Sequence, residues 1–320
     1  MKRFPPEGLM SGVAGALLAL LALESRALGA ALASLIADRA AIEHVYYEHR
    51  TGVKPPFEQV MPQAQLEKLV REDLKKEAVL ERVYGVKVTP AMVEAEVERI
   101  NATTRAPEVL AEIKTALGND PGRFANAMAR PIVVERTLRA RYDMDPQLHA
   151  AQRRLVETTR ARLLALKDGD FAGRLAALKE TREMEAEVQD AVTWQLTPRP
   201  PEDAPPSPAV TPSPTPVKAT GGLYTVVATA QVAQVLSSPN QDDEDKDRKF
   251  YFEDLPVDLQ NVLKAQLQKP ASVSAVIEAP SVFYLYLAKN RDARQLTAAV
   301  LTIRKRSYDE WLAAQPDTTL

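Results

Sequence analysis

The stretch Gln63-Ala-Gln-Leu-Glu-Lys-Leu-Val-Arg-Glu-Asp-Leu74 decides how the first half of this chain folds. Its apolar residues recur three or four positions apart, which is the spacing of one face of an α-helix. These residues are Leu66, Leu69, Val70 and Leu74. Further along, Gly85 suits the left-handed position that ends a helix, and Thr89-Pro90 offers a capping hydroxyl before a first-turn proline. The sequence therefore predicts two successive helices, each with one apolar face to bury.

Similar patterns lie on both sides of this pair. Residues 32–50 have apolar side chains at helical spacing, and Pro107 begins a further helix that ends near Gly118. Residues 123–142 repeat the pattern, with Val134, Leu138 and Tyr142 each four apart. We therefore expect residues 31–145 to form one helical domain.

This first half resembles the N-terminal chaperone module of secreted foldases of the SurA and PrsA type. The resemblance rests on the long amphipathic helix, the turn Gly85-Val-Lys-Val-Thr89 and the second helix that begins at Pro90. The segment Arg130-Pro-Ile-Val-Val-Glu-Arg-Thr-Leu138 is also similar to the one that closes that module. The match implies a helical module that binds other polypeptides. The alternative is an ordinary pair of core helices.

The second half resembles a parvulin-type peptidyl-prolyl isomerase domain. A helix that ends in Lys167-Asp-Gly-Asp-Phe-Ala172 before a second helix is similar to the start of that domain, and Phe250-Tyr-Phe-Glu-Asp-Leu-Pro256 is similar to a later part. Where the family has a glycine before its last strands, this chain has Pro270 and Ala271. A helical hairpin that turns at Gly169 is the plainer explanation of the first of these motifs.

Proline divides this second domain. Residues 198–216 contain nine prolines, which are incompatible with a helix or a hydrogen-bonded ladder. We expect residues 146–196 to form a helical hairpin and the first strand of this domain. Residues 197–220 are expected to be a disordered insertion. Residues 221–320 are expected to form the rest of the domain, with a C-terminal strand and helix. The predicted fold class is α+β, mainly α.

The N-terminus is typical of an exported protein. Lys2 and Arg3 precede an uncharged run over 9–23, followed by small residues around Ala30. This run is shorter than the roughly 20 residues that a membrane-spanning helix needs, so residues 1–30 are predicted to be a signal peptide. The alternative is an uncleaved anchor, through which alone the protein would contact a membrane. Both place the remainder outside the cytoplasm, in the periplasm or cell envelope.

Composition excludes several classes of function. The 41 basic and 43 acidic residues nearly cancel, so no field favours nucleic acid. The absence of cysteine excludes thiolate chemistry and Cys-based zinc sites. His44 and His49 are five apart and do not converge on one metal ion. We expect neither a metal site nor a cofactor.

The resemblance to parvulins breaks at the catalytic residues. Those isomerases use a histidine pair, with one member on the first strand and one on the last. This chain has histidine only at 44, 49 and 149, and Phe283 stands at the last-strand position. We therefore predict no catalytic residues and no isomerase activity.

An apolar surface for peptides remains possible without those histidines. We expect a cleft between the helical module and the sheet, and we predict that four residues line it: Phe252, Leu255, Phe283 and Tyr284. The expected partners are unfolded or extended polypeptides, outer-membrane proteins among them. The rival hypotheses are an active prolyl isomerase and a structural protein of envelope assembly.

Overall fold

The computed structural model describes residues 11–181, 186–199, 223–225 and 250–317, without the side chains of 11–28 and 223–225. The chain divides into two compact units. We call Met1–Arg141 with Leu312–Leu320 the helical unit, and Tyr142–Trp311 the sheet unit. The structure is mixed α+β and mainly helical, which confirms the fold class at this level.

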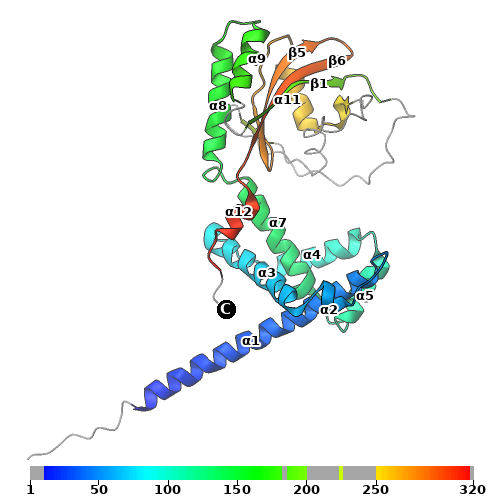
Figure 1. Cartoon of the computed structure of the whole chain (residues 1–320), viewed down its shortest axis with the longest axis vertical. Coiled ribbons are helices and arrows are strands. Elements are labelled where there is room, and N and C mark those ends of the chain that lie inside the picture. The colour runs from blue at the N-terminus through cyan, green and yellow to red at the C-terminus, as the bar shows by residue number, and fades with distance from the viewer. Residues whose placement is uncertain (1–10, 182–185, 200–222, 226–249, 318–320) are drawn as a thin grey trace, which may run out of the picture. The chain divides into compact units, whose positions relative to one another are not determined.

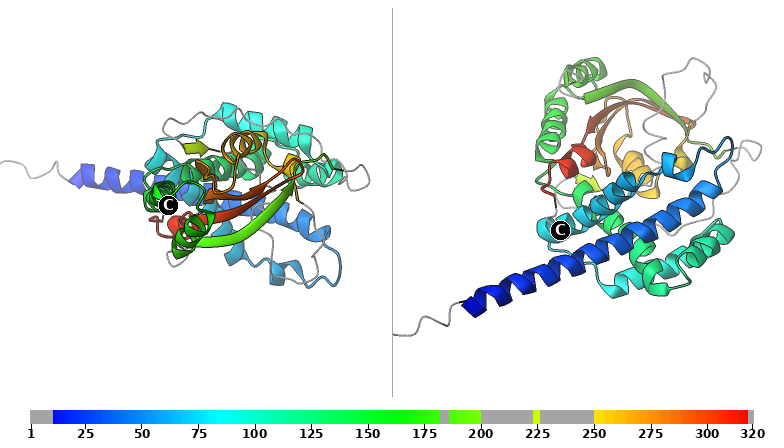
Figure 2. Two further views of the ribbon diagram at one scale, coloured as in Figure 1. Left: turned by 90° about the horizontal axis from the view of Figure 1, so that it is seen from above. Right: turned by 60° about the horizontal axis from the view of Figure 1, so that its bottom comes forward.

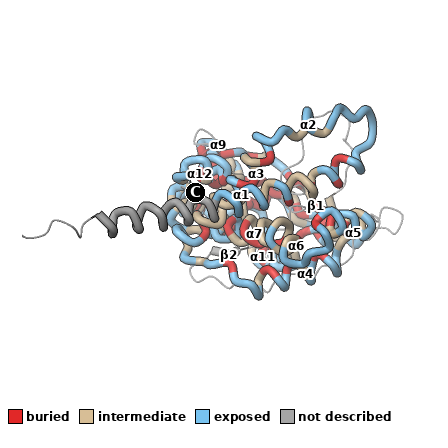
Figure 3. The backbone as a smooth tube through the Cα atoms, turned by 90° about the horizontal axis from the view of Figure 1, so that it is seen from below, coloured by how far each residue is buried: buried red, intermediate tan, exposed pale blue. Residues whose placement is uncertain are grey.

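The helical unit contains seven α-helices and one π-helical turn in its described part (Figure 1). They are α1 Ser11–Glu48, α2 Phe57–Val60, α3 Gln63–Tyr84, α4 Pro90–Thr103, α5 Pro107–Ala116, α6 Pro121–Phe124, η1 Ala125–Ala129 and α7 Arg130–Asp143, whose last two residues belong to the sheet unit. Helix α1 packs against α3, α5 and η1. Buried positions alternate with exposed ones along these helices (Figure 3), as one-sided burial requires.

The turn between α3 and α4 forms as predicted. Gly85 has a φ of 66°, and its N–H donates to the carbonyl of Glu81 over 2.9 Å. The Thr89 hydroxyl accepts a hydrogen bond of 3.3 Å from the N–H of Met92, and Pro90 opens α4. Both caps satisfy backbone groups that a helix end leaves unpaired.

Helix α1 joins two predicted segments. The expected signal segment 1–30 and the expected helix 32–50 fall largely within one continuous helix, Ser11–Glu48. In the described part of the chain, no helix has the length and apolar character needed to cross a membrane.

The sheet unit is built on a six-stranded sheet in the order β2-β4-β5-β6-β1-β3. Its strands are β1 Ala186–Gln195, β2 Leu223–Thr225, β3 Phe250–Tyr251, β4 Val276–Glu278, β5 Val282–Arg291 and β6 Gln295–Arg304. The long strands β5, β6 and β1 pair antiparallel, while β2 and β3 pair parallel at the edges. The helices are α8 Ala150–Ala165, α9 Phe171–Glu180, the 3₁₀ turn η4 Phe252–Asp254, α11 Val257–Gln266 and α12 Tyr308–Ala313.

Helices cover both faces of this sheet. Helices α8 and α9 pack against β5 on one face, where their side chains share an apolar cluster with Phe283 and Leu285. The sheet curves around α11 on the other face (Figure 2), where Leu259 and Leu263 pack against Trp194 and Tyr286. Two buried layers therefore enclose the central strands.

Parts of the predicted second domain lie outside the described residues. Of the insertion expected at 197–220 only 197–199 are described, and of 221–249 only β2 is. Helices α8 and α9 lie where the helical hairpin is expected, and β1 lies where the first strand is expected. In the sheet, β6 lies between β5 and β1.

Candidate functional site

The four residues predicted to line a peptide cleft are core residues. Phe252, Leu255 and Tyr284 belong to the apolar cluster under α11, and Phe283 belongs to the cluster under α8 and α9. Consecutive strand residues point to opposite faces, so Phe283 and Tyr284 cannot line one surface. All four are nearly or fully buried. The expectation of a surface shared by these residues is therefore corrected.

The sequence held a signal for this burial. Strand β5 reads Val282-Phe-Tyr-Leu-Tyr-Leu-Ala288, an unbroken apolar and aromatic run. Such a run is typical of a strand covered on both faces, whereas a half-exposed strand alternates apolar and polar residues.

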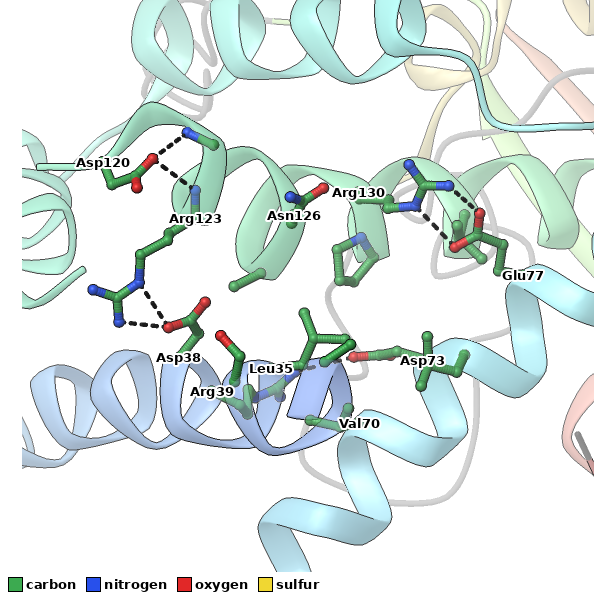
Figure 4. A pocket seen from close by; sticks show the side chains of 17 residues that line it. Leu35, Asp38, Arg39, Val70, Asp73, Glu77, Asp120, Arg123, Asn126 and Arg130 are labelled. Atoms are coloured by element: carbon green, nitrogen blue, oxygen red, sulfur yellow. Dashed lines mark hydrogen bonds and ion pairs between the residues drawn. The ribbon is translucent and has the colours of Figure 1, made fainter. Parts of the chain in front are cut away.

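An open cavity of about 540 Å³ lies instead in the helical unit (Figure 4). Residues from α1, α3, α6, η1 and α7 line it. Its apolar lining consists of Ala31, Leu35, Val70, Leu74, Ala127, Pro131 and Val134. The volume falls in the range typical of ligand sites, which are commonly apolar with a few polar groups.

Three ion pairs surround the cavity, and we call them the ion-paired rim. Arg123 Nε donates to Asp38 Oδ1 over 2.9 Å, and Arg39 donates to Asp73 over 3.3 Å. Arg130 binds Glu77 with two nitrogens, with Nε 2.9 Å from Oε2. The fourth carboxylate of the lining, Asp120, accepts hydrogen bonds from the backbone N–H groups of Gly122 and Arg123.

These pairs change the acidity of their members. The hydrogen bond that Arg123 donates to Asp38 raises the pKa of Arg123, and the one that Arg130 donates to Glu77 raises the pKa of Arg130. Burial raises the pKa of the Asp73 carboxyl, against the opposing effect of Arg39. Each arginine of the rim is thus already bound to a carboxylate of the same site.

Two uncharged polar residues of the lining, Ser34 and Asn126, are exposed and make none of the hydrogen bonds of the described chain, and Asn126 is the one that carries an amide. It belongs to η1, where the N–H of Arg130 donates to the carbonyl of Ala125 five residues earlier. Its side chain is exposed, and none of the hydrogen bonds of the described chain uses its amide. Single π-helical turns inside α-helices are frequent at functional sites.

The three histidines are not brought together. His49 lies 2.9 Å from Glu112 and His44 lies 3.9 Å from Glu48, both at exposed positions of the helical unit. His149 is buried in the sheet unit, with Nε2 2.9 Å from the Tyr142 carbonyl oxygen. Burial lowers the pKa of His149. Among the described residues, no cluster of three or more His, Asp or Glu side chains could hold a metal ion.

The chemistry available in the cavity is therefore that of binding. Its lining offers apolar contact, three ion pairs, the unengaged hydroxyl of Ser34 and the unengaged amide of Asn126. Comparison with known proteins found no match among family models, curated proteins or solved structures. The fold and cavity thus define a two-unit α+β protein with an open, largely apolar cavity in its helical unit.

Proposed function

We propose that this chain is an exported chaperone that holds extended stretches of unfolded polypeptide in the cavity of the helical unit. The observation that carries the proposal is an open apolar cavity whose surrounding charges are already paired with one another. Unfolded chains expose apolar side chains, and such a cavity removes them from water without needing a particular charge on the client.

The energetics suit weak and reversible binding. Each apolar side chain that enters contributes about 1.5 to 3 kcal/mol. Immobilising the client and its side chains opposes this gain by several kcal/mol, so two or three buried side chains leave only modest affinity. A chaperone requires such release because its clients must leave in order to fold.

We propose that the sheet unit is a parvulin-like domain without isomerase chemistry. In support, α8 and α9 form a hairpin that turns at Gly169, whose φ is 81°, and Phe252 lies just before α11 and the strands β4 and β5. The histidine pair of the isomerases has no counterpart, because His149 is the single histidine in the sequence of this unit.

The test is suppression of aggregation by the full chain. An unfolded outer-membrane protein is diluted into buffer with an equimolar amount of the purified protein, and light scattering is followed. We expect reduced scattering, and we expect Leu74→Glu to abolish the effect because it places a charge in the apolar lining. The matched control is Val83→Glu on the same helix, since Val83 is exposed away from the cavity and should leave suppression unchanged.

Other results would favour the rivals. Unchanged scattering with the wild-type chain counts against the chaperone. Accelerated isomerisation of an Ala-Pro peptide would favour the isomerase, and one stable stoichiometric partner without affinity for unfolded chains would favour a role in envelope assembly.

A further inference from the structure

We propose that the cavity selects uncharged, extended polypeptide segments, and that Asn126 recognises their backbone. This inference rests on the proposed function, because it names the class of segment that the same cavity accepts. It follows from the charges of the ion-paired rim and from the position of the one amide that they leave unengaged.

The rim excludes charged side chains. Arg123 and Arg130 each hold a carboxylate through a close hydrogen bond, and Arg39 pairs with Asp73. A charged client side chain that entered would lose its water without gaining an unpaired partner. An uncharged side chain avoids this penalty, so the paired rim acts as a filter for charge.

Asn126 can form hydrogen bonds with the backbone of an apolar client segment. An extended segment that leaves water carries backbone N–H and C=O groups that require partners. The carboxamide of Asn126 has one acceptor and two donors, which match both groups of a peptide unit. Its amide is exposed and uncommitted, unlike the charged groups on either side.

The arrangement places this amide within the path of a bound segment. Figure 4 shows Asn126 between Arg123 and Arg130 along α6, η1 and α7, with Leu35 and Val70 across the cavity. A segment that lies along this wall would have apolar side chains toward Leu35 and Val70 and its backbone within reach of Asn126.

The first experiment tests backbone recognition. Affinity of the full chain for a short fluorescent peptide rich in Leu and Val is measured by anisotropy, together with an analogue whose central amide bonds are esters. We expect Asn126→Ala to weaken binding of the amide peptide about 5- to 10-fold. The same substitution should weaken binding of the ester analogue much less. Asn290→Ala, at an exposed position of β5, is the control and should change neither affinity.

The second experiment tests the charge filter. In the wild-type chain, a Lys or a Glu at the centre of the peptide should weaken binding. Arg130→Gln leaves Glu77 without its partner. The affinity for the Lys peptide, relative to that for the Glu peptide, should therefore rise about tenfold or more. A general loss of structure would weaken both peptides alike and would not change their order.

These results separate the two proposals. If the wild-type chain binds none of the peptides, the proposed function fails. A different outcome overturns the inference but leaves the chaperone proposal standing. In it, Leu74→Glu abolishes peptide binding, but Asn126→Ala lowers the affinities for the amide and the ester peptide equally. Arg130→Gln also leaves the ratio of the affinities for the Lys and Glu peptides unchanged.

Discussion

Glu278 is the residue on which the buried charge of the sheet unit depends. It is 1% exposed and lies 2.9 Å from Lys305 Nζ and 2.7 Å from Arg153. Burial lowers the pKa of Lys305, while Glu278 opposes that change. Both cations also lie over the ring of Phe283.

Glu278→Gln should therefore destabilise the sheet unit strongly. It leaves a buried ammonium group without its carboxylate, and such losses cost about 3 to 5 kcal/mol. Urea denaturation measures the change in the free energy of unfolding. Glu187→Gln is the control, since its exposed ion pair with Arg304 spans 3.8 Å and should contribute less than about 1 kcal/mol. Equal effects of the two substitutions would contradict this account.

His149 should make the sheet unit sensitive to mild acid. Its pKa is lowered from 6.5, mainly by burial and further by Lys305, while the Tyr142 carbonyl, Asp145 and Glu278 oppose the shift. As the pH falls below about 6.5, the unfolded chain takes up a proton that the folded unit does not, so stability falls. The loss between pH 7 and pH 5 should not exceed about 2 kcal/mol, which is the limit for a histidine that stays neutral in the folded unit. His149→Gln should flatten this dependence, although it lowers stability at pH 7, and an unchanged slope would exclude His149 as its source.

At this scale, the sequence singled out some residues and not others. The capping role of Thr89 is visible because it depends on neighbours a few positions away. The proposed role of Asn126 is not visible in the sequence, because an isolated Asn between alanines carries no pattern.

At the scale of elements, the turn after α3 provides a sharp test. Gly85 has a positive φ, and an added Cβ would meet no neighbouring atom within 4 Å. Gly85→Ala should therefore cost about 1 to 2 kcal/mol through backbone strain alone. In the full-length chain, which keeps residues 1–30, Gly29→Ala lies in helix α1, is equally free of neighbours and should be neutral or stabilising by up to about 1 kcal/mol. Both are measured by urea denaturation, and a destabilisation of equal size at the two sites would refute the assignment of strain to Gly85.

Elements were predictable where the signal is local. The helices from Gln63 to Thr103 follow from apolar spacing and caps, whereas the order of the strands does not. Nothing in the sequence of β6 indicates that it lies between β5 and β1, because that place depends on contacts with residues more than a hundred positions away.

At the scale of the molecule, the two units should unfold separately. Each has its own apolar core, and the chain crosses from one to the other at residues 141–142 and again at 311–312. In the full chain, we expect Gly85→Ala to shift one thermal transition and His149→Gln to shift the other, as measured by calorimetry. A single transition that moves with both substitutions would contradict independent units.

The chain divides after Arg141, whereas the sequence places the end of the helical domain at 145, where its helix signals end, and Leu312–Leu320 group with the helical unit rather than with 221–311. The cavity could not be predicted in the same way. Its lining runs from Ala31 to Val134, and these residues share no motif until the helices bring them together.

The unbroken course of α1 has a consequence for the maturation of the protein. Peptidases grip their substrates as extended strands, and the backbone around Ala30 is helical on both sides. If residues 1–30 are a signal peptide, as the sequence predicts, its removal must come before the segment that follows has become helical and packed against α3. On that prediction, cleavage and helix formation compete for the residues around Ala30, so a chain that folds before cleavage keeps its first 30 residues.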